Sequence, residues 1–433
     1  MQSILTDFKL SSSTCWIILA ILSCREMPSS AKSLEGIALG TTYKIQYTSE
    51  IPEKQLQKGL DSLLYFLNKS LSTYLPNSDI SKINRGDTFV VVDKHFRKVF
   101  KKATAVWKST AGYFDPTVGS LVNAYGFGPE QPLNIVNQYD RDSLLLLTGW
   151  EKIRLLPNGI IKKQHPDIYI DFNALAKGYV VDVLGHYLAG LGDLNYMVEI
   201  GGEILAYGNS PKTNLPWKIA IEDPAQGTKR KFIQTLYLKN YALASSGNYR
   251  KYLVNPDTGE RFVHSINPIT GLANDSKILS TSVKAADCMT ADAWATALMV
   301  MPFEMGRQLI ESHPELEALW IVDERKKNKI ITSKEHNIFI HFPKDPTCPV
   351  CNETKPQRAN TGHKGEPEVD DLPEPKAWCD ALTADHKVLN EDDQSREFDQ
   401  NALIILDRFT QWLQSYPCKG KSAAEVEYCF KRF

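Results

Sequence analysis

The pattern of hydrophobic and polar positions between residues 35 and 343 predicts helices and strands in mixed order. Residues 40–47 alternate as a strand does, and the leucines of 53–73 recur with helical spacing. Further helices are expected at 96–111, 175–191 and 304–313, and further strands at 197–200, 217–223, 233–243, 279–284, 318–322 and 329–333. Because strands and helices come in runs rather than in strict alternation, the expected fold class is α+β.

The composition changes after Phe342. Residues 344–400 are rich in Pro, Asp, Glu and Lys and have few large apolar side chains, which is typical of a linker. Helical periodicity returns at 401–416 and predicts a further helix. Five of the eight cysteines lie in this tail, at Cys348, Cys351, Cys379, Cys418 and Cys429. This density favours disulfides, and half of a zinc site at the first two, with His341, His363 or His386, is the alternative.

A short apolar run, residues 15–23, follows Lys9 and ends at Cys24. Nine residues cannot span a bilayer as a helix, but the length fits the apolar core of a secretory signal. The sequence Ile-Leu-Ser-Cys at 21–24 resembles a bacterial lipoprotein box, in which the cysteine is lipidated and becomes the first mature residue. We expect a signal peptide at 1–24, a main domain at 25–343 and an extension at 344–433, with a buried N-terminal helix as the alternative to the signal. A lipid on Cys24 would anchor the chain to a membrane surface.

Length and charge narrow the class of function. A chain of 433 residues with 42% hydrophobic residues can bury a full core. Its net charge is −1, and no basic stripe with interleaved aromatic residues is present, which argues against nucleic acid as a partner.

Residues 285–301 contain the first candidate for chemistry. We expect a helix that starts at Thr290, because a threonine hydroxyl caps a helix N-terminus well. Asp292 lies in its first turn, and Thr296 lies four residues later on the same face. One carboxylate and one hydroxyl are hard oxygen donors of the kind that magnesium or calcium binds. The alternative is structural: Asp292 complements the helix dipole, and Thr296 bonds back to the helix.

Four further segments contain residues suited to a nucleotide-like ligand. The glycines at 201–202 follow a predicted strand, where backbone can approach a flat or phosphate-bearing molecule. Lys177 lies near a predicted helix N-terminus that would attract phosphate. Aromatic residues at Tyr74, Tyr125 and Phe127 could sandwich a planar ring, and His264 could act as a general base. Taken one at a time, each is better explained as a turn, a solvated charge or core material.

Taken together and in this order, the segments resemble the ApbE family, the FAD:protein FMN transferases. The resemblance runs from about Leu39 to Phe342 and rests on six separated motifs: Leu-Gly-Thr-Thr-Tyr at 39–43, Leu-Ser-Thr-Tyr at 71–74, and the segments that start at 115, 171, 199 and 287. The common nucleotide fingerprints, GxGxxG after a strand and GxxxxGK[ST], are absent, so the pattern without the family resemblance does not identify flavin.

The resemblance implies an ApbE-like, T-fold-related catalytic domain, followed here by a short cysteine-containing extension. It also implies a magnesium-dependent, lipid-anchored enzyme on the periplasmic side of a bacterial membrane. Such enzymes split FAD, release AMP and place FMN on a threonine or serine of flavoprotein subunits in membrane redox complexes. A metal-dependent FAD pyrophosphatase and a non-catalytic flavin-binding lipoprotein are the alternatives.

The resemblance assigns roles to individual residues. Asp292 and Thr296 would bind Mg²⁺ together with a backbone carbonyl near Ala174, and His264 would accept the proton of the incoming hydroxyl. The FAD contacts would come from Leu39, Tyr74, Tyr125, Lys177, Glu199, Gly201, Gly202 and Asn248. Three positions depart from the family pattern. Leu39 replaces methionine, and Tyr125 replaces tryptophan. Asn267 replaces the aspartate of the His-x-Ile-Asp-Pro motif that begins at His264.

Overall fold

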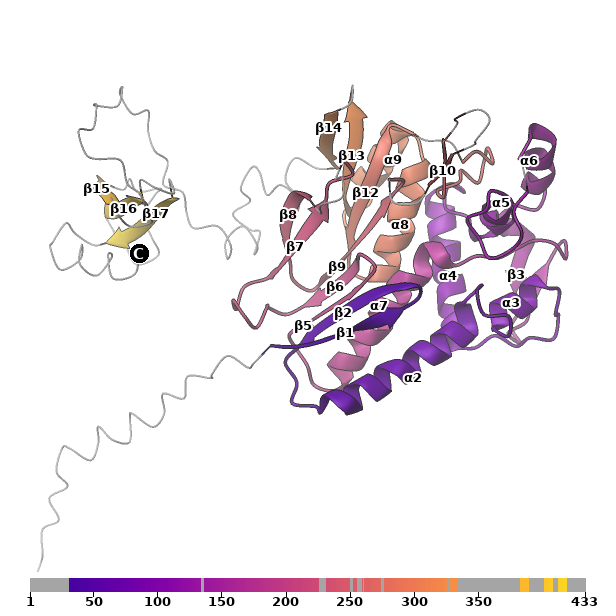
Figure 1. Ribbon diagram of the computed structural model, residues 1–433, viewed down its shortest axis with the longest axis horizontal. Helices are drawn as coiled ribbons and strands as arrows, with labels where there is room; N and C mark the ends of the chain where they lie inside the picture. The colour runs from indigo at the N-terminus through magenta and orange to yellow at the C-terminus, as the bar shows by residue number, and fades with distance from the viewer. Residues whose placement is uncertain are drawn as a thin grey trace, which may run out of the picture. The chain divides into compact units, whose positions relative to one another are not determined.

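The computed structural model describes residues 31–133, 136–225, 231–249, 252–254, 259, 261–273, 276–324, 327–333, 382–388, 401–407 and 412–418. The chain divides into two compact units, Met1–Phe342 and Pro343–Phe433 (Figure 1). The described part of the second unit is an antiparallel sheet of β15 (Leu382–Val388), β16 (Asn401–Asp407) and β17 (Trp412–Cys418). No helix in the described ranges is long and apolar enough to cross a membrane.

The first unit is built on an eight-stranded antiparallel sheet with the order β1-β2-β5-β6-β9-β12-β13-β14. Its strands are β1 (Lys32–Ala38), β2 (Thr41–Tyr47), β5 (Tyr196–Ile200), β6 (Glu203–Tyr207), β9 (Tyr241–Gly247), β12 (Ile278–Ala285), β13 (Glu317–Glu324) and β14 (Lys327–Thr332). Side chains alternate between the two faces, as pleating requires. Thus Ala318 and Trp320 join the main core, whereas Leu319 and Ile321 join a smaller cluster on the other face.

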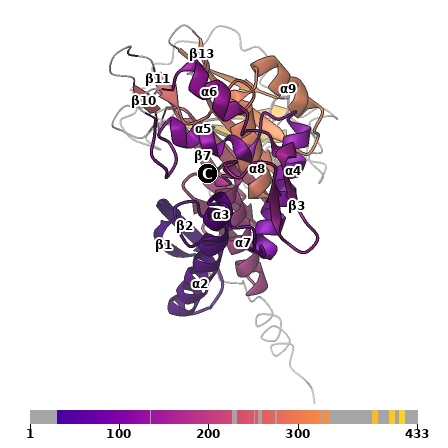
Figure 2. The same ribbon diagram turned by 90° about the vertical axis from the view of Figure 1, so that its right-hand side faces the viewer.

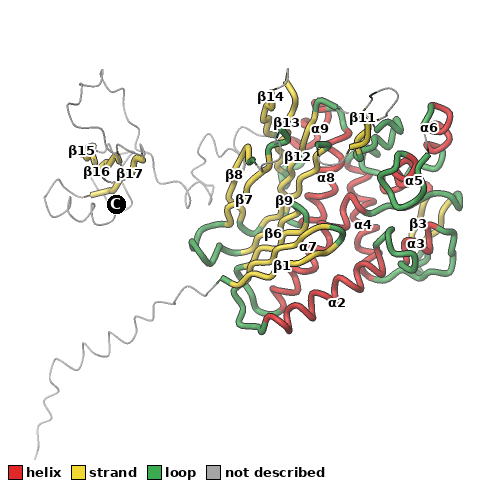
Figure 3. The backbone as a smooth tube through the Cα atoms, in the orientation of Figure 1, coloured by secondary structure: helices red, strands yellow, loops and turns green. Residues whose placement is uncertain are grey.

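Helices cover one face of the sheet and a hairpin covers part of the other (Figures 2 and 3). The helices α7 (Asn173–Gly190) and α8 (Cys288–Val300) pack directly on the strands, and α2 (Glu53–Leu71) and α4 (Lys94–Ser109) pack against them. The hairpin of β7 (Trp217–Glu222) and β8 (Phe232–Leu238) buries its apolar side against the opposite face. The remaining elements are α3 (Asp79–Asn84), α5 (Gly119–Ala124), α6 (Gln138–Leu145), α9 (Phe303–Glu311), the 3₁₀ turns at Pro116–Val118 and Trp150–Lys152, β3 (Ile153–Leu155), β4 (Ile161–Lys163), β10 (Tyr252–Val254) and β11 (Arg261–Val263).

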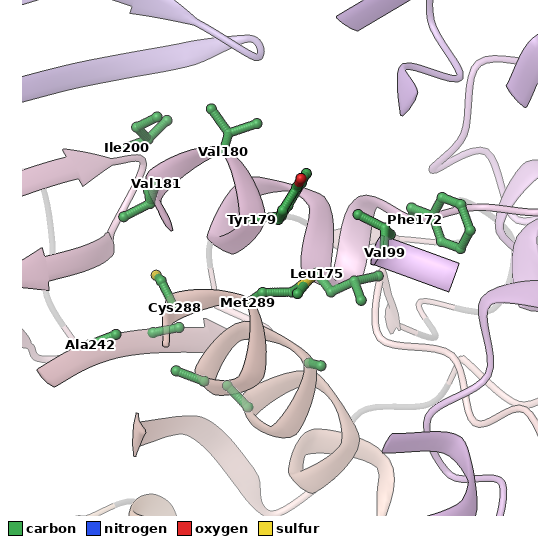
Figure 4. Close-up of a cluster of buried hydrophobic side chains, with 14 of the residues drawn as sticks. Val99, Phe172, Leu175, Tyr179, Val180, Val181, Ile200, Ala242, Cys288 and Met289 are labelled. Carbon is green, nitrogen blue, oxygen red and sulfur yellow. The ribbon is translucent and has the colours of Figure 1, made fainter. Parts of the chain in front are cut away.

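The α7–α8 pair is the centre of the core. Both helices are apolar around most of their circumference, which is typical of helices buried on several sides. Figure 4 shows buried side chains that they contribute, among them Leu175 and Val181 of α7 and Cys288 and Met289 of α8. Close packing at Gly178 depends on its missing side chain, because a Cβ there would lie 2.3 Å from the carbonyl oxygen of Cys288.

The α+β prediction is confirmed, with three corrections to individual elements. Residues 233–243 belong to two strands, β8 and β9, because the chain turns at Asn240, whose φ is +59°. The helix expected at 401–416 is wrong: β16 and β17 occupy this stretch, and a short apolar run does not distinguish a strand from a buried helix. The helix α8 is capped by Asp287 rather than Thr290, since the Asp287 side chain accepts a hydrogen bond from the Thr290 amide.

Several expectations lie outside the described residues. These are the signal peptide at 1–24 with Cys24, the cysteines Cys348, Cys351, Cys379 and Cys429, and the linker expected at 344–400 except for residues 382–388. Those seven residues form β15, which the linker prediction did not include. Cys418 ends β17, but the structure does not describe its side chain. The disulfide and zinc hypotheses therefore stay predictions.

Candidate active site

The site begins where Asp292 of α8 meets the first turns of α7. The Asp292 carboxylate is buried, and its Oδ2 accepts a hydrogen bond of 2.9 Å from the backbone amide of Gly178. In an α-helix, this amide points at the carbonyl four residues earlier, which belongs to Ala174. The Asp292 carboxylate therefore contacts α7 one helical turn after Ala174, whose carbonyl is the proposed third metal ligand.

Thr296 follows Asp292 by one helical turn and meets the sheet. Its hydroxyl lies 3.4 Å from the hydroxyl of Ser246 on β9. The backbone carbonyl of Ser246 in turn accepts a hydrogen bond of 3.0 Å from the Ser280 hydroxyl of β12. The metal-ligand candidates are thus bordered on the sheet side by neutral hydroxyl groups.

Buried charges surround Asp292. Lys177 forms an ion pair of 2.6 Å with Glu203, the first residue of β6, and the Glu203 side chain is buried whereas Lys177 is 33% exposed. Burial lowers the pKa of Lys177, but the carboxylates of Glu203 and Asp292 outweigh burial and hold this pKa above its ordinary value. Lys177 is therefore a cation at neutral pH. Sequence analysis missed Glu203, although it stands in the same motif as Glu199.

Burial also raises the pKa of Asp292, to about 8, with a smaller contribution from Glu203. Lys177 and the Gly178 amide act in the opposite direction. A buried carboxyl of this kind carries a stable charge only when a cation is close. One carboxylate with neutral hydroxyl and carbonyl oxygens fits a hard divalent cation such as Mg²⁺. In the described ranges, no group of three or more His, Cys, Asp or Glu side chains could hold a metal.

Two turns meet at one end of the sheet beside this pair of helices. Leu39 lies in the β1–β2 turn with a φ of +52°, and Gly201 and Gly202 connect β5 to β6 with φ values of +59° and +104°. The Gly201 amide donates a hydrogen bond of 3.1 Å to the Thr42 carbonyl, so the two turns are neighbours. Glu199 accepts a hydrogen bond of 2.7 Å from the Gly202 amide and fixes the second turn. Four of the residues expected to contact FAD are thereby brought together.

Tyr125 and His264 belong to a separate apolar cluster. Tyr125 donates a hydrogen bond of 3.1 Å to the Gly271 carbonyl, and its ring lies 5.6 Å from that of Phe262. The ring of Phe127 lies 6.3 Å from that of half-buried His264. Tyr125 thus braces the segment that carries His264, which agrees with the structural alternative for this residue.

Two other predicted FAD contacts differ in exposure. Tyr74 is 56% exposed after α2, where an incoming ring can reach it. Asn248 follows β9 and is 2% exposed, and its Oδ1 has no donor among the described residues. An unpaired buried acceptor is costly, so this atom fits a donor supplied by a ligand.

Comparisons with known proteins agree with the expected family. The model of the ApbE family matches residues 39–320. The chain is 36% identical over 318 residues to the FAD:protein FMN transferase of Vibrio cholerae, which covers 71% of this chain and 93% of the relative. It is 34% identical over 294 residues to the protein of that name from Haemophilus influenzae, covering 65% of this chain and 84% of the relative.

Solved structures agree as well. The flavin transferase ApbE from Vibrio cholerae has a TM-score of 0.63 at 35% identity, over 70% of this chain and 97% of that chain. The apo flavinyl transferase ApbE from Pseudomonas stutzeri has the same TM-score at 28% identity, over 70% of this chain and 95% of that chain. The match to the family model spans both helices of the α7–α8 pair and most of the sheet. The chain therefore belongs to the ApbE family.

Proposed function

We propose that the chain transfers FMN from FAD to a threonine or serine hydroxyl of an acceptor protein and releases AMP. Membership of the ApbE family supports flavin transfer, since curated relatives carry the name FAD:protein FMN transferase. The structural observation that carries the proposal is the hydrogen bond from Gly178 to Asp292, which holds a buried carboxylate against the helical turn that follows Ala174.

The reaction exchanges the phosphoanhydride bond of the FAD pyrophosphate for a phosphoester bond to the acceptor. The acceptor oxygen bonds to the phosphorus on the FMN side, and the bond from this phosphorus to the bridging oxygen breaks. AMP leaves with that oxygen and its electron pair, and the proton of the hydroxyl moves to the imidazole of His264. A neutral imidazole suits this role near pH 7, because a hydroxyl is a weak nucleophile until a base removes its proton.

Phosphoryl transfer depends mainly on positioning and on neutralising charge. Asp292, Thr296 and the Ala174 carbonyl would hold Mg²⁺, and the bound ion would supply the positive charge that offsets the pyrophosphate and the leaving AMP. Lys177 supplies a fixed positive charge beside them. Leu39, Tyr74, Tyr125, Glu199, the Gly201–Gly202 turn and Asn248 would bind and orient FAD, and the unpaired Oδ1 of Asn248 would accept from it.

The cellular place of the reaction is part of the proposal. A lipid on Cys24 would hold the enzyme on the periplasmic side of a bacterial membrane, close to flavoprotein subunits of membrane redox complexes. Labelling cells with radioactive palmitate tests this anchor. The full-length chain should incorporate label, and Cys24→Ser should not; label in both variants, or in neither, contradicts the anchor.

The activity test combines two readouts. The chain from residue 25 onward is incubated with FAD, Mg²⁺ and a candidate acceptor subunit, and AMP release and covalent flavin fluorescence of the acceptor are measured. Asp292→Asn and His264→Gln should abolish both signals. The matched controls are Asp193→Asn, another buried aspartate, and His313→Gln, a histidine in contact with Trp294 and Glu315 outside the site.

The outcomes separate the candidate functions. AMP with a fluorescent acceptor, lost in the two site variants and kept in the controls, supports the transferase. AMP without a labelled acceptor, across several acceptor subunits, favours the FAD pyrophosphatase. Bound FAD without AMP contradicts both enzymes and leaves a flavin-binding protein.

A further inference from the structure

Asp182 joins the two helices that carry the proposed metal ligands. It lies in the middle of α7 and is 4% exposed. Its Oδ1 accepts a hydrogen bond of 2.7 Å from the Cys288 amide, and its Oδ2 accepts one of 2.9 Å from the Met289 amide. These amides open α8, where backbone donors have no partner inside the helix. Both oxygens of one side chain therefore fasten the first turn of α8 to α7.

This contact repeats the geometry of the metal site one turn away. Ala174, Gly178 and Asp182 follow one another at intervals of four residues and share one face of α7. Cys288 and Asp292 have the same spacing on α8. The bonds from Gly178 to Asp292 and from the α8 amides to Asp182 thus act side by side. Two such contacts fix both the separation and the rotation of one helix relative to the other.

We propose that Asp182 is a positioning residue for the divalent cation. By holding the first turn of α8 against α7, it fixes the distance from Asp292 and Thr296 to the Ala174 carbonyl. The inference rests on the proposed function, since it presumes that these three groups bind a metal. It adds a residue that touches neither metal nor substrate.

Asp193 provides a matched control because it makes the same kind of contact elsewhere. It is 1% exposed, and its Oδ2 accepts hydrogen bonds of 2.7 Å and 2.9 Å from the amides of Thr48 and Ser49. It lies beyond the C-terminal end of α7 and fastens the segment after β2. Replacing either aspartate with asparagine removes one acceptor and turns an NH₂ group toward a backbone donor. Only Asp182 lies next to the proposed metal ligands.

Metal binding is measured directly on the full mature chain. Metal-free wild type, Asp182→Asn, Asp193→Asn and Asp292→Asn are titrated with Mn²⁺, and the free ion is followed by electron paramagnetic resonance. Mg²⁺ is then added as competitor. We expect Asp182→Asn to bind Mn²⁺ about 10- to 100-fold more weakly, the usual effect of removing a group that orients metal ligands. Asp193→Asn should bind as the wild type does, although its melting temperature falls comparably.

A kinetic measurement separates positioning from general loosening. In Asp182→Asn, the Mg²⁺ concentration for half-maximal flavin transfer should rise by a similar factor, while kcat at saturating Mg²⁺ stays within a few-fold of wild type. If Asp182→Asn does not fold, Asp182→Ser replaces it, because the shorter side chain removes the carboxylate without turning an NH₂ group toward the α8 amides.

Unchanged Mn²⁺ affinity in the Asp182 variant overturns the inference, and so does an equal loss in Asp193→Asn. If wild type and Asp292→Asn bind Mn²⁺ equally weakly, the proposed metal site itself is wrong, and the role of Asp182 falls with it. The wild-type titration therefore distinguishes failure of the inference from failure of the proposed function.

Discussion

Replacing Gly178 with alanine tests whether the close approach of α7 and α8 controls both stability and activity. The added Cβ would lie 2.3 Å from the Cys288 carbonyl oxygen and 2.9 Å from the Cβ of Asp292. Neither atom belongs to a flexible side-chain end that could rotate away. Because real Cβ contacts essentially never fall below 3.0 Å, the helices must separate by about 0.7 Å.

The magnitude follows from two opposing effects. Adding a methyl group to a well-packed core costs about 1–3 kcal/mol of unfolding free energy. Alanine is favoured over glycine inside a helix by about 1 kcal/mol, which offsets part of this cost. We therefore expect a net loss of up to about 2 kcal/mol. The same separation moves Asp292 away from the Ala174 carbonyl, and a misplacement near 1 Å can reduce a rate by about 100-fold.

Urea denaturation measures the first effect, and covalent flavin fluorescence of the acceptor measures the second. Gly190→Ala is the control, because Gly190 ends the same helix and a Cβ added there would have nothing within 4 Å. It should leave activity unchanged and leave stability unchanged or slightly higher. If Gly178→Ala unfolds at the wild-type urea concentration and transfers flavin at the wild-type rate, the packing argument is refuted.

Three further predictions concern single groups. Burial raises the pKa of Asp115 to about 6 from its ordinary 3.8, so its stabilising contribution is complete below about pH 4 and disappears as pH rises through 6. Between these pH values, the unfolding free energy of the wild type should fall by about 3 kcal/mol more than that of Asp115→Asn. Urea denaturation at a series of pH values measures both, and an equal pH dependence of the two proteins would contradict this prediction. Lys177→Met leaves Glu203 buried without its ion-pair partner and should lower the unfolding free energy by about 2 kcal/mol. This loss is smaller than that expected for breaking a fully buried pair, because Lys177 is 33% exposed. The double variant with Glu203→Gln should recover part of that loss, and no recovery would show that the pair is not the cause. His264→Gln should abolish transfer yet keep the wild-type dissociation constant for FAD, measured by flavin fluorescence; wild-type transfer would exclude His264 as the base.

The apolar pattern predicted the long helices well because burial of apolar side chains dominates their packing: α2 buries one face, and α7 is buried on several sides. The leucines of 53–73 and the apolar residues of 175–191 indicated α2 and α7 within a few residues of their bounds. The edge strand β1 escaped prediction, since its polar and apolar residues are mixed and it is held by pairing with β2. The helix expected at 401–416 was wrong for a related reason: a contiguous apolar run suits β16 as well as a helix.

At the site, sequence indicated the groups but not their partners. The spacing of Asp292 and Thr296 follows from helix geometry and needed no tertiary information. The amide that binds Asp292 comes from Gly178, 114 residues earlier, and the partner of Lys177 comes from β6. Such pairings depend on how α7 packs on α8 and on the sheet. Local pattern does not encode that packing, and this is why Glu203 was missed.

The start of α8 explains why this end of the helix suits a cation rather than a phosphate. A helix N-terminus attracts anions through its unpaired amides, but here protein oxygens already occupy them. Asp182 binds the first two amides, and Asp287 binds the amide of Thr290 through its side chain and that of Ala291 through its carbonyl. Four carboxylates then surround the turn, from Asp182, Asp287, Asp292 and Glu203, against the two ammonium groups of Lys102 and Lys177. The local excess of negative charge favours a divalent cation, and the pyrophosphate of FAD would be held through that cation and Lys177 rather than by the helix itself.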